Sequence, residues 1–297
     1  MTVMRRFALA ASTFSVLALV CAGAAQAQAP APNAPAKELF GKKVDAAPLK
    51  ARSIGFYSKG CLAGAVALPV NGQTWQVMRL SRNRNWGHPD LISFLERFAT
   101  KVPKVAGWKG ILVGDLAQPR GGPMLTGHAS HQVGLDADIW LTPMPERTLG
   151  NDERETFPPQ LMVRADRRDI DPKTWTPGHV QVIRAAAEDP EVERIFVNAA
   201  IKKALCREAP HAAWMSKVRP YWGHDYHMHV RLHCPKDSPD CKPQTPPGHD
   251  DGCGKELDWW FRDAIINPPP PKEKPKPKRP ITMAELPPSC RDVLLAK

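Results

Sequence analysis

The sequence predicts one folded domain in which short strands are mixed with amphipathic helices. Residues 89–103 carry leucine and phenylalanine at the three- and four-residue spacing of a helix with one buried face. Residues 227–233, HMHVRLH, alternate between polar and apolar side chains, which is the period of a half-buried strand. A chain of 297 residues is long enough to bury a sizeable core.

The other elements follow from the same two periodicities. Short runs at 74–80 (TWQVMRL), 135–141 (LDADIWL) and 192–198 (VERIFVN) are predicted to be strands. Residues 179–190 and 199–208 are predicted to be helices.

The N-terminus has the composition of a secretory signal peptide over residues 1–27. Arg5 and Arg6 precede an apolar run at 7–25, and a small-x-small motif ends at Ala27. A membrane anchor is the alternative, but this run is short and rich in alanine and serine, whereas a span needs roughly 20 strongly apolar residues. We therefore expect an exported protein, cleaved near Ala27, with no transmembrane segment in its mature form.

Cleavage at that site removes Cys21 and leaves six cysteines. An even number in an exported chain indicates disulfide bonds, and the count alone leaves every pairing open. A zinc–thiolate site is the competing interpretation, which the lack of any C-x-x-C pair disfavours. The six are Cys61, Cys206, Cys234, Cys241, Cys253 and Cys290.

Composition divides the rest of the chain into three segments. Residues 28–52 are rich in alanine and proline and are predicted to form a flexible linker. A folded domain is expected over 53–266, followed by a Pro- and Lys-rich extension at 267–297, in which residues 268–280 are expected to be extended polyproline. Because Cys290 lies beyond the prolines, we predict that a disulfide ties this extension back to the domain.

The charge of the chain favours an anionic partner outside the cytosol. The formal net charge is +11, and loss of Arg5 and Arg6 with the signal peptide lowers it by two, to +9. For an exported protein, this charge suits an anionic surface such as a cell-wall polymer. The basic residues are not interleaved with aromatic ones as in a nucleic-acid module, so we predict no nucleic-acid partner.

Histidines are crowded into GHASHQVGLDADIW (127–140) and YWGHDYHMHV (221–230). On a strand, His227 and His229 project from the same face about 6–7 Å apart. That separation suits one histidine bound to a metal and its neighbour reaching a water molecule or the substrate. Isolated surface histidines are the alternative for either segment alone.

His131 and Asp138 are separated by an odd number of residues, so a continuous strand would place them on opposite faces. Gly134 can interrupt the strand, because glycine accepts conformations that other residues resist. Together with His229, these residues would offer two imidazoles and one carboxylate, a catalytic zinc arrangement with one position left for water. A serine triad through Ser130 is the alternative, which the lack of a G-x-S-x-G motif disfavours.

These segments resemble the paired H-x6-D and H-x-H motifs of the lysostaphin, D-alanyl-D-alanine peptidase and hedgehog group of zinc proteins. Six motifs, in order, narrow the resemblance to the penicillin-insensitive murein endopeptidase family, from about Ser53 to Cys290. They are GCLAGAVALP, QVMRLSRNRNWGHPDLISF, GHASHQVGLDADIW, RIFVNAAIKKALC, KVRPYWGHDYHMHVRLHCP and DGCGKELDWWF.

The resemblance implies an α+β fold, with a small antiparallel sheet and flanking helices, as in hedgehog and D,D-peptidases. It also implies a periplasmic enzyme that cuts the D-alanyl–meso-diaminopimelate cross-links of peptidoglycan by zinc-activated water. Such an enzyme is insensitive to β-lactams, because these act by acylating a serine. The alternatives are a zinc D,D-carboxypeptidase and a non-catalytic zinc protein that binds the cell wall.

The matching motifs also imply roles for individual residues. His131, Asp138 and His229 would bind the catalytic zinc. His227 would act as the general base, and its presence favours catalysis over binding alone. His224 would polarise the scissile carbonyl or stabilise its tetrahedral intermediate.

Further roles are implied around this set. His128 would line the site and contact metal. A second metal position would use Asp166, although Asp169 stands where the family pattern has a histidine. The favoured alternative is that Asp166 and Asp169 are solvated charges on a loop. Arg82 and Arg84 are expected to bind carboxylates of the substrate, with which arginine pairs well.

The resemblance finally implies the disulfides Cys61–Cys290, Cys206–Cys253 and Cys234–Cys241. Trp259 and Trp260 are expected to pack the C-terminal helix rather than to bind sugar.

Overall fold

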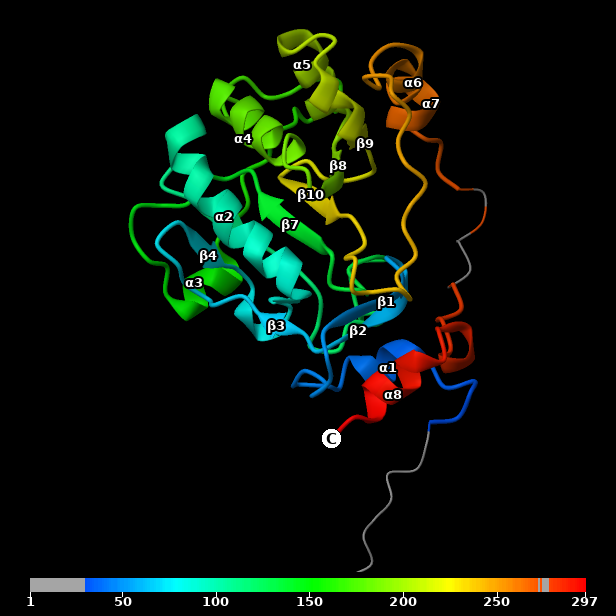
Figure 1. Ribbon diagram of the computed structural model, residues 1–297. Coiled ribbons are helices and arrows are strands. Elements are labelled where there is room, and N and C mark those ends of the chain that lie inside the picture. Colours follow the sequence, from blue (N-terminus) through cyan, green and yellow to red (C-terminus); the bar gives the residue numbers. More distant parts are fainter. Residues whose placement is uncertain (1–29, 272, 274–277) are drawn as a thin grey trace, which may run out of the picture.

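A six-stranded sheet lies at the centre of the fold in the computed structural model, which describes residues 30–271, 273 and 278–297 (Figure 1). Its strands are β4 (Trp75–Val77), β6 (Ile111–Val113), β7 (Asp136–Trp140), β8 (Val192–Val197), β9 (Val218–Pro220) and β10 (His227–Leu232). In the order β4-β6-β7-β10-β8-β9, the four inner strands pair antiparallel with one another, while both edge strands pair in parallel. The fold is α+β as expected, but the sheet is antiparallel only at its centre.

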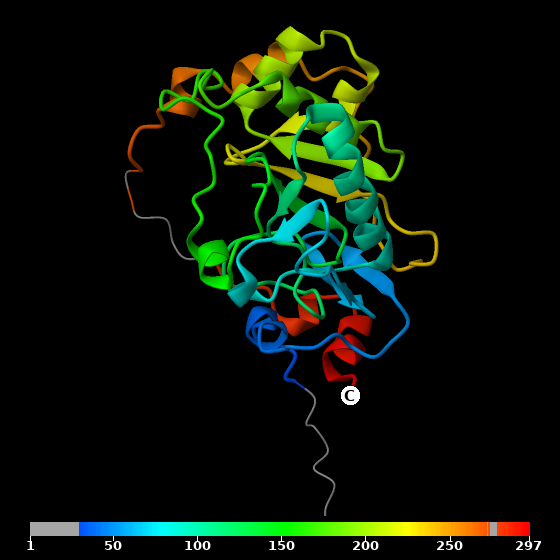
Figure 2. The same ribbon diagram turned by 90° about the vertical axis from the view of Figure 1, so that its left-hand side faces the viewer.

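Helix α2 (Pro89–Ala106) covers one face of this sheet beside α4 (Pro177–Ala187), as Figures 1 and 2 show. Its apolar face joins the main core with the strands. The His88 ring accepts the backbone N–H of Asp90 at the N-terminus, and Gly107 ends the helix in the left-handed conformation, with φ at 70°. Both helices were predicted: α2 begins at the predicted residue and ends three residues later, whereas α4 begins two residues and ends three residues earlier than predicted.

Local signals predicted some boundaries well and others poorly. Helix α5 (Ala199–Glu208) has the predicted bounds, because the Asn198 side chain caps its first turn. The strand predicted over 74–80 is shorter, because Arg79 takes a left-handed φ of 57° and a 3-10 helix, η1 (Leu80–Arg82), follows at once.

Two small sheets and several short helices complete the fold. β1 (Arg52–Phe56) pairs with β2 (Lys59–Ala63), and β3 (Val66–Ala67) pairs with β5 (Trp86–Gly87). The short helices are α1 (Ala36–Phe40), α3 (Asn151–Thr156), α6 (Lys255–Trp259), α7 (Asp263–Ile266) and α8 (Ser289–Leu295), with 3-10 helices η2 (Ala213–Lys217) and η3 (Met283–Glu285). Within residues 30–271, 273 and 278–297, no helix is long and apolar enough to cross a membrane. The signal peptide predicted at 1–27 lies outside the described residues.

The segment before β1 is packed, so the prediction of a flexible linker over 28–52 is wrong for its described part. Ala36 and Phe40 on α1 are fully buried in a second small core, which α8 completes. Figure 1 shows α1 and α8 side by side, in blue and red. The composition gave no sign of this packing. A single Phe40 ring makes no periodic apolar pattern in the sequence, and it is buried only because the distant helix α8 packs over it.

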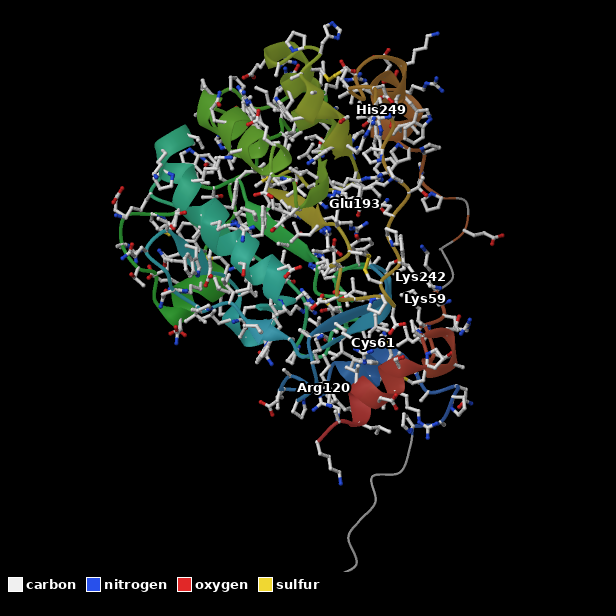
Figure 3. The ribbon with its side chains drawn as sticks, in the orientation of Figure 1. Lys59, Cys61, Arg120, Glu193, Lys242 and His249 are labelled. Carbon is white, nitrogen blue, oxygen red and sulfur yellow. A yellow bond between two sulfur atoms is a disulfide. The ribbon has the colours of Figure 1, made fainter. Side chains whose placement is uncertain are left out.

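Arg120 joins the N- and C-terminal segments of the described chain. Its guanidinium donates to the carbonyl oxygens of Val293, Leu294 and Ala296 at 2.8–2.9 Å. It also donates to the carbonyl oxygen of Asp45 at 3.1 Å. Figure 3 shows Arg120 and Cys61 beside the red helix α8. The last carbonyl groups of this helix are thus satisfied by a buried cation.

The three disulfides are those implied by the family resemblance. Cys61–Cys290 joins β2 to α8, which confirms that a disulfide ties the C-terminal extension back to the domain. Cys206–Cys253 joins α5 to the segment before α6. Cys234–Cys241 closes a short loop after β10.

Loss of Cys61–Cys290 should destabilise the protein more than loss of Cys234–Cys241. The first bond spans 229 residues and the second spans 7, and a longer closed loop restricts the unfolded chain more. We expect the double alanine variant of the long-range pair to lose about 4 kcal/mol of unfolding free energy, and that of the short-range pair about 2 kcal/mol. Urea denaturation measures both, and equal losses would contradict this assignment.

Candidate metal centre

The register of two antiparallel strands brings the predicted ligands together. On β7 and β10, Asp138 lies directly opposite His229, so both side chains emerge on the same face. The His229 Nδ1 atom lies 3.3 Å from Asp138 Oδ1, and His131 Nε2 lies 3.4 Å from the same oxygen. His128 Nε2 lies 3.5 Å from the other oxygen of Asp138. Ligand atoms of His128, His131 and Asp138 all lie within 4.8 Å of one another, and His229 adjoins them. We call these four residues, as a candidate site, the metal centre.

The loop before β7 resolves the odd spacing between His131 and Asp138. Gly134 adopts a φ of 73°, as its predicted role in interrupting the strand requires, and a Cβ there would lie 2.4 Å from a methyl group of Leu62. His131 itself adopts a φ of 64°, which is uncommon for a residue with a side chain. The chain therefore turns back before β7, and the His131 ring reaches the same side of the sheet as Asp138.

A second buried carboxylate, Asp136, holds both histidine segments in place. It is fully buried and accepts the backbone N–H of His131 at 2.9 Å. It also accepts His229 Nε2–H at 3.0 Å and Arg231 Nε–H at 2.7 Å. Because Nε2–H is donated to Asp136, Nδ1 is the His229 atom that faces Asp138 and would bind a metal. Burial alone would lower the pKa of His229, but Asp136 and Asp138 outweigh burial and raise it to about 9, so a metal would have to displace the Nδ1 proton. Burial alone would raise the pKa of Asp136, but Arg231 and His229 outweigh burial and hold that pKa well below its usual range.

Sequence reasoning missed Asp136, although its signal was present. In LDADIWL, Asp136 and Asp138 are two residues apart on a strand and therefore share a face. The same alternation on β10 places Arg231 beside His229, and the strand register sets Arg231 opposite Asp136.

The centre fits a bound cation. Among the described residues, seven buried side-chain nitrogen or oxygen atoms have no hydrogen-bond partner, and four of them lie at this site. They are His131 Nδ1, His131 Nε2, Asp138 Oδ1 and His227 Nδ1. An unpaired buried polar group costs about 1–3 kcal/mol, so this concentration of unpaired polar atoms indicates a site for a ligand. Imidazole and carboxylate donors are those that zinc prefers.

The two predicted substrate-binding arginines contact a third acid, Asp115. Arg82 and Arg84 each donate to its Oδ2 atom, at 3.0 and 2.9 Å, and His128 Nε2 lies 3.0 Å from that oxygen. Burial would raise the pKa of Asp115, but His128 and the two arginines lower it to about 2. The Arg84 side chain is only 10% exposed and is engaged within the protein, whereas that of Arg82 is 47% exposed. Only Arg82 is therefore accessible to a substrate carboxylate.

The structure does not bring Asp166 to the metal centre. Its carboxylate accepts hydrogen bonds from the Arg164 guanidinium and the Arg168 backbone N–H, at a separate surface depression. Asp169 accepts two hydrogen bonds from Arg207, each 2.9 Å long, and its Oδ2 lies 3.2 Å from Lys203 Nζ. In the part of the chain that the structure describes, these acids are neutralised by side chains and do not assemble a second metal position.

Two hollows flank the metal centre. A cavity of about 490 Å³ is lined by Phe56, Ser58, His128, Ser130, Phe196, Tyr221, His224, His229, Arg231 and Gln244, among others. A cleft of about 100 Å³ on the other side is lined by Arg79, Arg82, Asp115, His128, Asp138, Trp140, Tyr226 and His227, among others. A peptide bond at the centre would thus have room on both sides.

His224 and His227 are positioned at these hollows as neutral rings. His224 Nδ1–H donates to the carbonyl oxygen of Trp222 at 2.7 Å, which leaves Nε2 as its acceptor. Burial, together with His227 and His229, lowers the pKa of His224 to about 3. Burial also lowers the pKa of His227, whose Nε2 atom lies 3.6 Å from Asp138 Oδ1.

Replacing Asp136 with asparagine should weaken metal binding by about 10–100-fold, because the partner that orients His229 loses its charge. Competition with a chelator measures the dissociation constant for zinc, and circular dichroism verifies folding. The exposed residue Asp152 provides the matched control, Asp152→Asn, with unchanged affinity expected. Undiminished affinity in folded Asp136→Asn protein would contradict the role of this carboxylate.

Comparison with known proteins gives a consistent assignment. The family model described as penicillin-insensitive murein endopeptidase matches residues 53–295. Proteins of that name from Haemophilus influenzae, Pectobacterium atrosepticum and Klebsiella pneumoniae subsp. pneumoniae are each 44% identical to this chain, over 246, 244 and 247 residues. These matches cover 82% of this chain and 83%, 84% and 86% of the respective relatives. The chain therefore belongs to the penicillin-insensitive murein endopeptidase family.

Proposed function

We propose that this protein is a zinc-dependent endopeptidase that hydrolyses D-alanyl–meso-diaminopimelate cross-links of peptidoglycan and is insensitive to β-lactams. Family membership supports the activity class. The observation that carries the proposal is the buried set of His131, Asp138 and His229, whose ring nitrogens lie 3.3–3.4 Å from one Asp138 oxygen between two hollows. The ring nitrogens of His131 and that oxygen of Asp138 have no hydrogen-bond partner among the described residues.

His131, Asp138 and His229 would hold the zinc ion, with His128 as an additional contact. When bound, zinc acts as a Lewis acid that polarises a carbonyl group and makes water more acidic. Asp136 orients the His229 ring, so the donor atoms are placed before any metal arrives.

His227 is the proposed general base. Its ring is buried and neutral at the edge of the small cleft, and its Nδ1 atom has no partner among the described residues. A neutral imidazole in this position accepts the proton of the attacking water and passes it to the leaving amine.

The hydrogen bonding of His224 suggests a more specific role than the family resemblance implied. While the ring is neutral, Nε2 accepts hydrogen bonds, so it suits the attacking water or a substrate N–H group. Stabilising an oxyanion would require a second proton on this ring, and burial disfavours that proton.

Insensitivity to β-lactams follows from hydrolysis without an acylated serine. Ser130 lines the large cavity, but no histidine of the described chain forms a hydrogen bond with its hydroxyl group. The serine-triad alternative therefore has no base in place.

The expected compartment is the periplasm and the expected partner is peptidoglycan. The three disulfides suit an oxidising compartment. The net positive charge suits an anionic polymer.

Purified cross-linked muropeptide dimers should be converted to monomers by the zinc-loaded protein. Conversion should stop with a zinc chelator, return when zinc is restored, and continue with excess penicillin, as followed by mass spectrometry. Removal of terminal D-alanine from an uncross-linked pentapeptide, without dimer cleavage, would instead indicate a carboxypeptidase. Binding to murein with neither reaction would indicate a wall-binding protein.

His227→Gln should lower kcat on the dimers by about 10²–10⁴-fold, because the variant removes the proposed base. Zinc content, measured by mass spectrometry of the native protein, should stay at the wild-type level. His233→Gln is the matched control, since this nearby histidine is exposed. An unchanged kcat in zinc-loaded His227→Gln protein would rule out the base assignment.

A further inference from the structure

Three tryptophans form a cluster near the metal centre, in which Trp260 is half-buried and the other two are exposed. Trp222 is 53% exposed and Trp259 is 38% exposed. The Trp222 ring centroid lies 4.8 Å from that of Trp260 and 6.3 Å from that of Trp259. In α6, the buried residue is Leu257, so the expectation that Trp259 packs the C-terminal helix is not met. We call Trp222, Trp259 and Trp260 the tryptophan platform.

The loop between β9 and β10 fixes one side of the platform to the metal centre. This loop carries Trp222 and, two residues later, His224, whose Nδ1–H donates to the Trp222 carbonyl oxygen. The side chain of Asn198 donates to the carbonyl oxygen of Gly223 at 2.9 Å, and Gly223 takes a φ of 69°. The position of Trp222 is therefore coupled to that of a side chain lining the large cavity.

The other side of the platform is held by covalent and buried polar contacts. Cys206–Cys253 joins α5 to the residues before α6, which carries Trp259. The fully buried Lys202 donates to the carbonyl oxygen of Asp251. Figure 1 shows α6 beside α5 and β9. Two distant segments are thus fastened so that their indole rings meet at the surface.

The platform is continuous with the cavity at the metal centre. Tyr221, adjacent to Trp222, lines that cavity together with His224 and His229, and is itself 52% exposed. A polymer with its cleavable bond at the metal centre would therefore extend over the tryptophans. Contiguous exposed aromatic rings on a soluble protein mark an interaction site.

An amino-sugar ring suits this surface best. One face of a pyranose carries only C–H groups and packs on an indole, while its rim carries polar groups. None of the three platform indole N–H groups donates a hydrogen bond in the described structure, so they are available to those polar groups.

We propose that the tryptophan platform binds amino-sugar rings of the glycan strand whose peptide cross-link lies at the metal centre. This inference rests on the proposed function, because that function supplies a substrate in which peptides branch from sugar chains. It identifies the platform as a substrate-positioning surface distinct from the residues that hold metal or move protons.

The first test is binding of peptide-free glycan strands, prepared from murein with an amidase, followed by tryptophan fluorescence and calorimetry. This assay requires no catalysis. The wild-type protein should bind, Trp222→Ala/Trp259→Ala should bind at least tenfold more weakly, and Trp259→Ala alone should be intermediate. Val44→Ala is the matched control, because Val44 is exposed and lies outside the platform. Equal binding by wild-type and double variant, or no binding by the wild-type protein, would overturn the proposal.

The second test compares two substrates with the same variants. The double variant should show an at least tenfold higher KM on cross-linked glycan strands, with kcat/KM unchanged on cross-linked peptides that lack sugars. An equal loss on both substrates would overturn a sugar-binding role. Glycan binding that depends on the platform, in a protein that cleaves no cross-link, would support the platform and refute the proposed function. Loss of binding to anionic phospholipid vesicles, with glycan binding unchanged, would reassign the platform to membranes.

Discussion

The buried carboxylate of Asp136 is the interaction on which the metal centre depends. It has three donors from two segments: the backbone of His131, the ring of His229 and the guanidinium of Arg231. A buried carboxylate is stable only when it is fully paired, and removing one partner leaves an uncompensated charge. Arg231 supplies that compensation directly opposite on the sheet, so the ion pair and the strand register reinforce each other.

Further contacts of Arg231 connect the metal centre to the rest of the fold. The Arg231 guanidinium lies 4.0 Å from the centroid of the Tyr57 ring. The Tyr57 hydroxyl donates to Glu193 at 2.7 Å and lies 2.8 Å from the carbonyl oxygen of Leu232. Tyr57 lies in the turn between β1 and β2, and Cys61 on β2 is bonded to the C-terminal helix. The C-terminal helix, which sequence composition placed outside the folded domain, is therefore bonded to the strand pair that carries Tyr57.

Metal binding at this centre would be linked to the stability of the fold. Unpaired lone pairs on His131 and Asp138 represent an unfavourable contribution to the folded state without a cation. A cation that binds them adds its binding energy to the stability of the fold. The neighbouring acid, Asp115, differs from Asp138 because it already has three partners, namely Arg82, Arg84 and His128. Asp138 is thus left available for a metal, whereas the charge of Asp115 is compensated by its protein partners.

Local sequence determined the elements whose signals lie within one or two turns. The Asn198 cap set the start of α5, and the alternation in HMHVRLH placed His227, His229 and Arg231 on one face. The paired motifs named His131, Asp138 and His229 as candidate ligands, and the family resemblance implied the disulfide pairing. The cap and the strand alternation depend on residues that are neighbours in the chain. The ligands and the disulfides depend on sequence motifs long enough to indicate a family.

Tertiary structure alone decided which partners those residues meet. Asp136 and His229 are 93 positions apart, and the commitment of Arg84 to Asp115 likewise appears only when distant segments pack. Phe40 is buried only because α8 returns to cover it. Each parallel edge of the sheet arises because a helix connects the two paired strands, α2 between β4 and β6 and α5 between β8 and β9. Hydrophobic burial and charge compensation act between atoms close in space, whereas capping and periodicity act along the chain. The sequence therefore specified the candidate ligands, while the packing of distant segments specified how they are held.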